Sequence, residues 1–232
     1  HQVAKANGVS LPQGVLAGLT AALNLIATAP HLLPGWLRMP QGHRVVGPVY
    51  ARLPGELPEF LADLVAGPQP LVYFAMGSSG NRDLILHVLA GLGRADCQVL
   101  APVRSHLRQE DLETLPRNVH VTDWLPAHQL GDAVDLAITH GGEGTVQTSC
   151  VQGWPFIGIP LQFEQRFNVQ RCAAFGSARL VSQREARRTD WAELVRQALA
   201  DDGMRSRARR MAGLMEGLDG PGRAAEAICE LL

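Results

Sequence analysis

The sequence predicts an α/β fold with a parallel, doubly wound sheet, and three observations support this. Short apolar runs alternate with helical patterns along residues 70–217, and parallel strands need crossover helices between them. Glycine and proline account for 24 and 15 of the 232 residues, which favours many tight connections over a helical bundle. The 46% hydrophobic and 19% charged content is ordinary for a globular chain. We therefore expect a sizeable buried core and exclude a disordered chain.

Charge and cysteine usage exclude several classes of function. The formal net charge is -1, from 21 basic and 22 acidic side chains, so no excess positive field is available to hold a nucleic acid. The four cysteines stand singly, without a Cys-x-x-Cys pair, which predicts buried free thiols and no zinc site. The apolar residues 15–33 are interrupted by glycine, proline and polar residues. We expect no signal peptide, no membrane span and a cytoplasmic location.

The first seventy residues differ from the rest, because they hold nine of the fifteen prolines. This density predicts a linker with short elements and no core of its own. Within it, the pattern favours a helix over residues 13–22, a strand over 23–27 and a helix over 56–65.

From residue 70 onward, strands and helices are expected in regular alternation. Leu71–Met76 is a continuous apolar run that stops at Gly77-Ser78-Ser79-Gly80, as expected for a strand buried on both faces. The expected strands are 71–76, 97–101, 119–122, 135–139, 156–159 and 178–181, and the expected helices are 83–92, 109–115, 127–134, 144–152, 168–175, 191–200 and 205–217. Six such strands predict a Rossmann-like sheet whose ligands bind at the carboxyl ends of the strands.

A glycine-rich turn, His140-Gly141-Gly142-Glu143-Gly144-Thr145, follows the strand that ends at residue 139 and opens the next helix. Such a turn lets backbone N–H groups approach an anion, and a helix N-terminus adds about half a positive charge. A diphosphate pocket is one interpretation, with His140 and Thr145 as hydrogen-bond donors. The other is a tight turn in which Thr145 caps the helix. The turn lacks the Lys-Ser/Thr ending of a Walker loop, and no acidic residue is clearly placed for NAD binding.

Several motifs occur in an order that resembles a known family. They are Asn118-Val119-His120-Val121-Thr122-Asp123-Trp124-Leu125-Pro126, the turn at residues 140–145, Gly153-Trp154-Pro155-Phe156-Ile157-Gly158-Ile159-Pro160-Leu161, and then Glu164, Gln165 and Asn168. This series resembles the donor-binding signature of the UDP-glycosyltransferase-like enzymes with the GT-B fold. The bacterial branch that glycosylates antibiotics and other natural products is the most similar.

The resemblance implies a set of donor-binding residues. Trp124 would stack on the nucleobase, although it could instead be a half-buried loop anchor. His140, Gly142, Gly144 and Thr145 would bind the diphosphate. Glu164 and Gln165 would hydrogen-bond the sugar hydroxyls, whereas without the motif they would be an exposed loop pair. Ser78 would contact the phosphates from the opposite side, or cap the following helix.

One position departs from the family pattern and bears on the nucleotide. The family usually carries a glutamate, which binds the ribose hydroxyls of a uridine donor, where this chain has Thr148. Thr148 cannot grip a vicinal diol equally well. This departure favours a dTDP-sugar over a UDP-sugar as the donor.

The resemblance also implies a division of the chain. Residues 1–46 would be the tail of an N-terminal acceptor domain with a linker, 47–217 the nucleotide-sugar donor-binding domain, and 218–232 a C-terminal helix. Gly47-Pro48 would lie at the hinge. The family's catalytic histidine and its aspartate belong to the N-terminal domain, so no catalytic residue is expected in this chain, which we expect to be inactive alone.

The function implied is inverting transfer of a sugar from a dTDP- or UDP-sugar to a small hydrophobic acceptor, which would bind through the missing N-terminal domain. No metal and no cofactor are expected, because the nucleotide sugar is a substrate and no carboxylate pair is placed to hold an ion. An alternative is a non-catalytic nucleotide-sugar-binding subunit, or an activator, that needs a separate N-terminal partner. An exposed apolar surface on residues 15–33 would favour that alternative.

Overall fold

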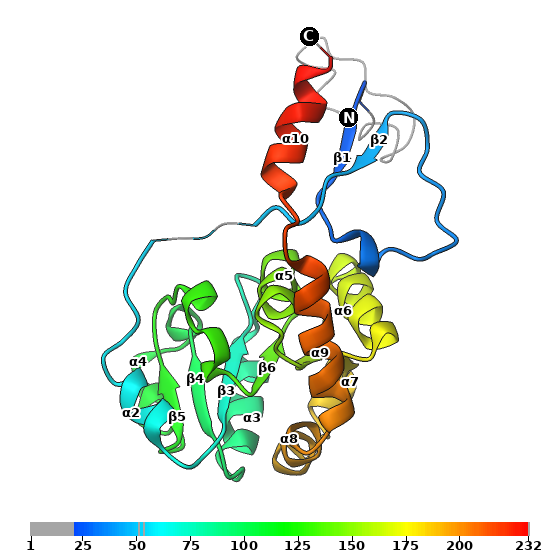
Figure 1. Ribbon diagram of the computed structural model, residues 1–232. Helices are drawn as coiled ribbons and strands as arrows, with labels where there is room; N and C mark the ends of the chain where they lie inside the picture. The colour runs from blue at the N-terminus through cyan, green and yellow to red at the C-terminus, as the bar shows by residue number, and fades with distance from the viewer. Residues whose placement is uncertain (1–20, 51, 53, 232) are drawn as a thin grey trace, which may run out of the picture. The chain divides into compact units, whose positions relative to one another are not determined.

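The computed structural model describes residues 21–50, 52 and 54–231 (Figure 1). The chain divides into two compact units, one made of His1–Val49 with Leu218–Leu232 and the other of Tyr50–Gly217. Among the described residues, no helix is both long and apolar enough to cross a bilayer.

The larger unit contains a six-stranded, entirely parallel sheet (Figure 1). Its strands are β3 Leu71–Ala75, β4 Gln98–Ala101, β5 Val119–Val121, β6 Leu136–Thr139, β7 Phe156–Gly158 and β8 Ala178–Leu180. Their hydrogen-bonded order is β5-β4-β3-β6-β7-β8. The chain therefore adds β4 and β5 on one side of β3. It then returns to the other side of β3, where β6, β7 and β8 follow in order. The predicted doubly wound sheet is confirmed, with a strand at each predicted position.

The connections between the strands are helical. The helices and helical turns of this unit are α2 Leu61–Ala66, α3 Arg82–Leu92, η3 Arg104–His106, α4 Gln109–Leu112, η4 Ala127–Gln129, η5 Gly131–Ala133, α5 Glu143–Gln152, α6 Phe163–Phe175, α7 Gln183–Ala186, α8 Trp191–Leu199 and α9 Asp202–Met215. α3 packs against α8, and α5 packs against both α9 and α6.

The core lies between the sheet and these helices. Every side chain of β3 is buried, as expected for a central strand covered on both faces. Val72 and Phe74 join a cluster with residues of α3 such as Ile85 and Leu89. Trp191 is fully buried in the same cluster, and its indole N–H donates to the Ala186 carbonyl at 2.9 Å, so its polar atom is satisfied.

Some helix predictions were wrong in extent. The helix expected over 127–134 is two 3₁₀ turns separated near Gly131, a residue that disfavours helix. The helix expected over 109–115 ends at Leu112, and that over 56–65 begins only at Leu61. Pro58 keeps Leu57 out of a helix, because the residue before a proline is disfavoured there, and residues 59–60 form a turn before α2 begins.

Two further corrections concern helix starts. α6 begins at Phe163, five residues before the expected Asn168, because Gln162 and Gln165 form a capping box at its N-terminus. α7 was not predicted, although Ser182 and Glu185 form the capping box that starts it.

The smaller unit has a two-stranded parallel sheet of β1 Asn24–Ile26 and β2 His43–Val45, together with η2 Pro30–Leu32 and α10 Gly220–Cys229. β1 confirms the expected strand, whereas β2 was not predicted. The expected helix over 13–22 lies outside the described residues, except for Ala21 and Ala22, which are not helical. An exposed ion pair joins Arg44 to Glu230 at 2.5 Å.

Candidate functional site

The loops that follow β3, β4, β5, β6 and β7 leave from the same edge of the sheet, the one formed by the carboxyl ends of the strands. These ends lie together because the strands are parallel. β3 and β6 are neighbours, and their connections leave in opposite directions along the sheet. This is the topological switch point, where open α/β sheets form their ligand crevice. The predicted glycine-rich turn follows β6 and therefore lies at this point.

The turn after β6 keeps its backbone close to α6. Gly141 has φ +86°, and a Cβ added there would lie 2.5 Å from Val169 Cγ2 and 2.8 Å from the Gln165 carbonyl oxygen. A larger residue at position 141 would have a strained backbone, and its side chain would collide with these atoms. Gly142 is the N-cap of α5, and no side chain of the described residues caps that end. Gly144 is exposed, with open space where its Cβ would be. A helix N-terminus without a side-chain cap favours an anion, so the start of α5 is a candidate anion site.

His140 is a buried side chain in this turn, with 7% of its surface exposed. Its ring lies close to two glycines, since a Cβ at Gly77 would be 2.5 Å from its Cε1 and a Cβ at Gly142 would collide with its Nε2. Nδ1 lies 3.4 Å from the Ala75 carbonyl oxygen. Burial lowers the pKa of His140 below its usual value, while the hydrogen bond to the Ala75 carbonyl and the nearby Glu164 carboxylate partly oppose this shift. The imidazole is therefore mainly neutral at pH 7.

The two threonines of α5 donate to backbone carbonyls at the start of the helix. Thr145 Oγ1 donates to the Gly142 carbonyl at 2.9 Å and accepts from Thr139 Oγ1 at 2.8 Å. Thr148 Oγ1 donates to the Gly144 carbonyl at 2.8 Å. Both side chains are half-buried at the start of α5. Their contact with a donor stays a prediction.

Glu164 and Gln165 lie in the first turn of α6, not in a loop. Gln165 is buried, and its Oε1 accepts the N–H groups of Leu161 and Gln162 at 2.9 and 3.1 Å. Its amide therefore already has partners within the chain. Glu164 is exposed and accepts from Asn168 Nδ2 at 2.6 Å. Of the two, Glu164 keeps the freer polar surface, and a sugar contact by either stays a prediction.

Asn168 joins α6 to the turn after β6. Its Nδ2 donates to the Gly141 carbonyl at 3.2 Å as well as to Glu164. The sequence motif included Asn168 without a role. The structure shows that it ties the proposed sugar-binding end of α6 to the proposed phosphate turn.

Ser78 and Trp124 are both exposed at this edge. Ser78 lies at the tip of the turn after β3. Trp124 follows β5 and keeps 46% of its surface exposed, while Gly55 lies against its ring, because a Cβ there would be 2.5 Å from Trp124 Cζ3. One part of the indole thus packs on the chain and the other is available for stacking.

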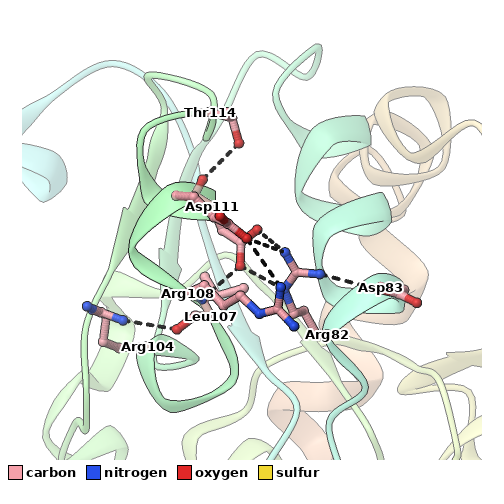
Figure 2. Close-up of polar contacts among 8 residues, drawn as sticks. Arg82, Asp83, Arg104, Leu107, Arg108, Asp111 and Thr114 are labelled. Carbon is pink, nitrogen blue, oxygen red and sulfur yellow. Dashed lines mark hydrogen bonds and ion pairs between the residues drawn. The ribbon is translucent and has the colours of Figure 1, made fainter.

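Two features at this edge were missed. His106, in η3 after β4, donates from Nε2 to the Gly77 carbonyl at 2.7 Å. Arg82, at the start of α3, binds Asp111 of α4 through its Nε at 2.8 Å and its Nη2 at 2.5 Å (Figure 2). The position of His106 shortly after an expected strand was a usable signal, whereas the pairing of Arg82 with Asp111 depends on tertiary structure.

The described residues contain no group of three or more histidine, cysteine or carboxylate side chains that could hold a metal ion. The three cysteines buried in this unit are free, and Cys150 of α5 lies 3.8 Å from Cys172 of α6, measured between sulfur atoms.

Comparison with known proteins identifies the family. Residues 86–231 match the family model of the erythromycin biosynthesis protein CIII-like C-terminal domain. The chain belongs to this CIII-like family. The match covers α5, α6 and the site residues above from residue 86 onward, whereas the turn after β3 and Arg82 precede it.

Curated relatives of this CIII-like chain are named as transferases. The PGL/p-HBAD biosynthesis rhamnosyltransferase of Mycobacterium bovis (strain BCG / Pasteur 1173P2) is 29% identical over 188 residues, which cover 81% of this chain and 41% of that protein. The 3-alpha-mycarosylerythronolide B desosaminyl transferase of Saccharopolyspora erythraea is 26% identical over 206 residues, covering 86% of this chain and 48% of that protein. The chain thus spans less than half the length of these relatives.

Solved structures confirm the fold of the CIII-like chain. The spinosyn rhamnosyltransferase SpnG complexed with thymidine diphosphate has a TM-score of 0.73 and 21% identity, covering 91% of this chain and 57% of that chain. The calicheamicin glycosyltransferase CalG4 has a TM-score of 0.73 and 21% identity, covering 98% of this chain and 56% of that chain. The fold is therefore that of the C-terminal domain of GT-B glycosyltransferases, as the resemblance implied.

Proposed function

We propose that this chain is the donor-binding half of a glycosyltransferase that moves a sugar from a nucleoside diphosphate to a small hydrophobic acceptor. Its relatives are named as rhamnosyl and desosaminyl transferases, and its family is defined by an antibiotic biosynthesis protein. The observation that carries the proposal is the uncapped N-terminus of α5, beside the buried His140 and at the switch point of the sheet.

In this proposal the diphosphate lies against the first turn of α5. The backbone N–H groups of that turn, including that of the exposed Gly144, would supply donors at close range. His140 would donate a hydrogen bond to a phosphate oxygen, and Ser78 would contact the phosphates from the turn after β3. Thr145 would add its hydroxyl by reorienting from the Gly142 carbonyl.

The sugar and the base would lie on either side of the diphosphate. Glu164 would accept hydrogen bonds from sugar hydroxyls, with Gln165 fixing the end of α6 beside it. The exposed part of Trp124 would stack on the base, which is worth about 1–3 kcal/mol in comparable sites. We favour thymidine over uridine, because Thr148 offers one hydroxyl where a glutamate would grip a ribose diol. The likeness to a thymidine diphosphate complex agrees with this choice.

The reaction would be a direct displacement with inversion. An acceptor hydroxyl oxygen forms a bond to the anomeric carbon, the bond from that carbon to the diphosphate oxygen breaks, and its electron pair leaves with the diphosphate. Donors at α5 and His140 stabilise that growing negative charge. The acceptor proton passes to a base supplied by the acceptor domain, so we assign no catalytic base to this chain. We propose no metal ion or cofactor, and a cytoplasmic location.

Titration calorimetry of the 232-residue chain with dTDP, UDP and thymidine tests the proposal. We expect dTDP to bind with a Kd of roughly 10 μM to 1 mM, a free energy of about -7 to -4 kcal/mol. We expect dTDP to bind at least as tightly as UDP, and thymidine more weakly than either. No heat with either diphosphate at millimolar concentration would refute the site, whereas a preference for UDP would refute only the choice of nucleoside.

A further inference from the structure

The turn Gly77–Gly80, which follows β3, has a supporting side chain that the donor-binding motifs do not include. We propose that His106 is a positioning residue that holds this turn in the conformation that receives the diphosphate. The proposal rests on the proposed function for the identity of the ligand. Its evidence is the set of contacts made by the turn itself.

The Gly77 carbonyl is the point at which the turn is held. It accepts the Gly80 N–H at 3.4 Å, which is long for a hydrogen bond, and His106 Nε2 at 2.7 Å, which is short. Gly77 has φ +52°, a conformation that only glycine adopts readily. Because the internal bond of the turn is weak, the bond from His106 is the stronger of the two that fix this carbonyl.

His106 also limits the space around the turn. A Cβ at Gly80 would lie 3.0 Å from His106 Nε2, so the imidazole is in close contact with the end of the turn as well as with its start. His140 packs against Gly77 from β6. Gln165 of α6 donates to Ser79 Oγ at 3.2 Å. The turn is thus held from three sides, and Ser78 is left exposed between these supports.

The segment that carries His106 is itself anchored. The Arg104 N–H donates to the Thr122 carbonyl at 3.1 Å, and its guanidinium donates to the Leu107 carbonyl at 3.1 Å (Figure 2). A few residues on, Asp111 binds Arg82, which begins the helix after the turn (Figure 2). The loop between β3 and α3 is therefore fixed to the segment 104–111 at both ends. A rigid support of this kind suits a loop that must present Ser78 to a phosphate.

His106 also acts on His140 electrostatically. A positive charge on His106 lowers the pKa of His140, whereas Glu164 raises it. A substitution test must therefore separate the hydrogen bond of His106 from its charge. His106→Gln keeps an N–H donor at a comparable distance without the charge, and His106→Leu keeps the bulk without the donor.

The experiment measures dTDP, thymidine and pyrophosphate binding by calorimetry on the 232-residue chain and its variants. We expect His106→Leu to weaken dTDP binding at least fivefold and thymidine binding less than twofold, because only the phosphates of dTDP face the turn. His106→Gln should restore dTDP affinity to within about threefold of the unsubstituted chain. The control is His87→Leu, at an exposed histidine of α3 that belongs to none of the donor-binding motifs. It should leave dTDP binding unchanged.

A second measurement follows the turn without ligand. Amide hydrogen exchange at Gly80 should be faster in His106→Leu and normal in His106→Gln. Equal losses for dTDP and thymidine, a failure of glutamine to rescue, or unchanged exchange in His106→Leu would each overturn the proposal. If the unsubstituted chain binds no dTDP, the proposed function fails and the ligand part of this inference fails with it, while the exchange data still decide whether His106 holds the turn.

Discussion

At the scale of single residues, His140 is a buried side chain that lies beside the proposed anion site. Burial lowers its pKa, so the free chain holds it neutral near pH 7, and Nδ1 and Nε2 must share one proton. Nδ1 faces the Ala75 carbonyl at 3.4 Å, and because a carbonyl oxygen can only accept, the proton of the neutral ring resides on Nδ1. Nε2 therefore donates to a phosphate oxygen only when the ring takes up a second proton, which the negative charge of a bound diphosphate favours.

We expect His140→Ala to weaken dTDP binding by about 1–3 kcal/mol, the usual worth of a hydrogen bond to a charged group, while thymidine binding changes little. Calorimetry with both ligands measures the difference. Equal losses, together with a large fall in melting temperature, would instead identify His140 as a packing residue.

Two glycines of the same turn give a matched pair of substitutions. Gly141→Ala should destabilise the fold by more than about 1 kcal/mol, because the backbone has φ +86° and the methyl group would meet Val169. Gly144→Ala should be neutral or stabilising by up to about 1 kcal/mol, since its Cβ position is open and alanine favours helix. Urea unfolding measures both.

The same two variants distinguish an effect on folding from an effect on dTDP binding. Gly144→Ala should lose dTDP affinity although it folds well, because a methyl group would stand where the phosphate approaches the helix. Normal dTDP binding by Gly144→Ala would contradict the placement of the diphosphate at α5.

At the scale of elements, the pair Arg82–Asp111 joins α3 to α4. Asp111 also accepts the Arg108 N–H at 2.7 Å, so it caps α4 while it binds Arg82. The side chain of Asp111 is only 6% exposed. Hydrogen bonding to Arg82, and then to the Arg108 backbone, lowers the pKa of this carboxyl.

Because the pKa of Asp111 is lowered in the folded chain, its contribution to stability is fully present above the ordinary carboxyl pKa of about 3.9 and is lost as the pH falls through the lowered value. Asp111→Asn should therefore lower the melting temperature at pH 7, and the difference from the unsubstituted chain should shrink below about pH 3.9. Thermal melts across this range test the sign. A difference that grows on acidification would show that Asp111 is not the charged partner.

The elements also show what the sequence could predict. The central strands were placed correctly because both of their faces are buried, which makes each a short apolar run, as in Leu71–Ala75. The edge strands Val119–Val121 and Ala178–Leu180 are only partly buried, and each contains a polar residue. The start of α6 was missed, since Phe163, Glu164 and Phe167 are exposed and give no apolar periodicity. Its signal was instead the capping box of Gln162 and Gln165, with glutamine in place of the usual small N-cap residue.

The site was predictable in outline for a related reason. The order of the strands places the turns after β3 and β6 at one edge, so His140 and Ser78 could be assigned to it from the sequence. The contacts of Gln165 with Ser79 and of His106 with Gly77 span 86 and 29 residues. No local pattern determines such pairs, because they depend on how loops from separate strands meet.

At the scale of the whole molecule, the chain consists of two units, and the core cluster lies entirely within the larger one. Its members run from Val72 to Met204. The larger unit therefore has its own buried apolar core, which is the requirement for folding alone.

We expect residues 47–217, expressed alone, to fold cooperatively and to bind dTDP within about twofold of the 232-residue chain. Far-UV circular dichroism, thermal unfolding and calorimetry test this expectation. Loss of cooperative unfolding would show that residues outside this range contribute to the core. Normal folding with lost binding would show that the donor site extends into the smaller unit.

The central position of β3 has a consequence for how the molecule is made. β3 is the first strand of the sheet to leave the ribosome, but its pairing with β6 joins Val72 to Leu136. β4 can cover one edge of β3 early, whereas the other edge stays unpaired until some sixty further residues have been synthesised. Pairing at such long sequence separation is slow, and an open apolar edge is prone to aggregate. The yield of folded protein should therefore be set by how quickly β6 docks during translation, and slower growth at lower temperature should raise it.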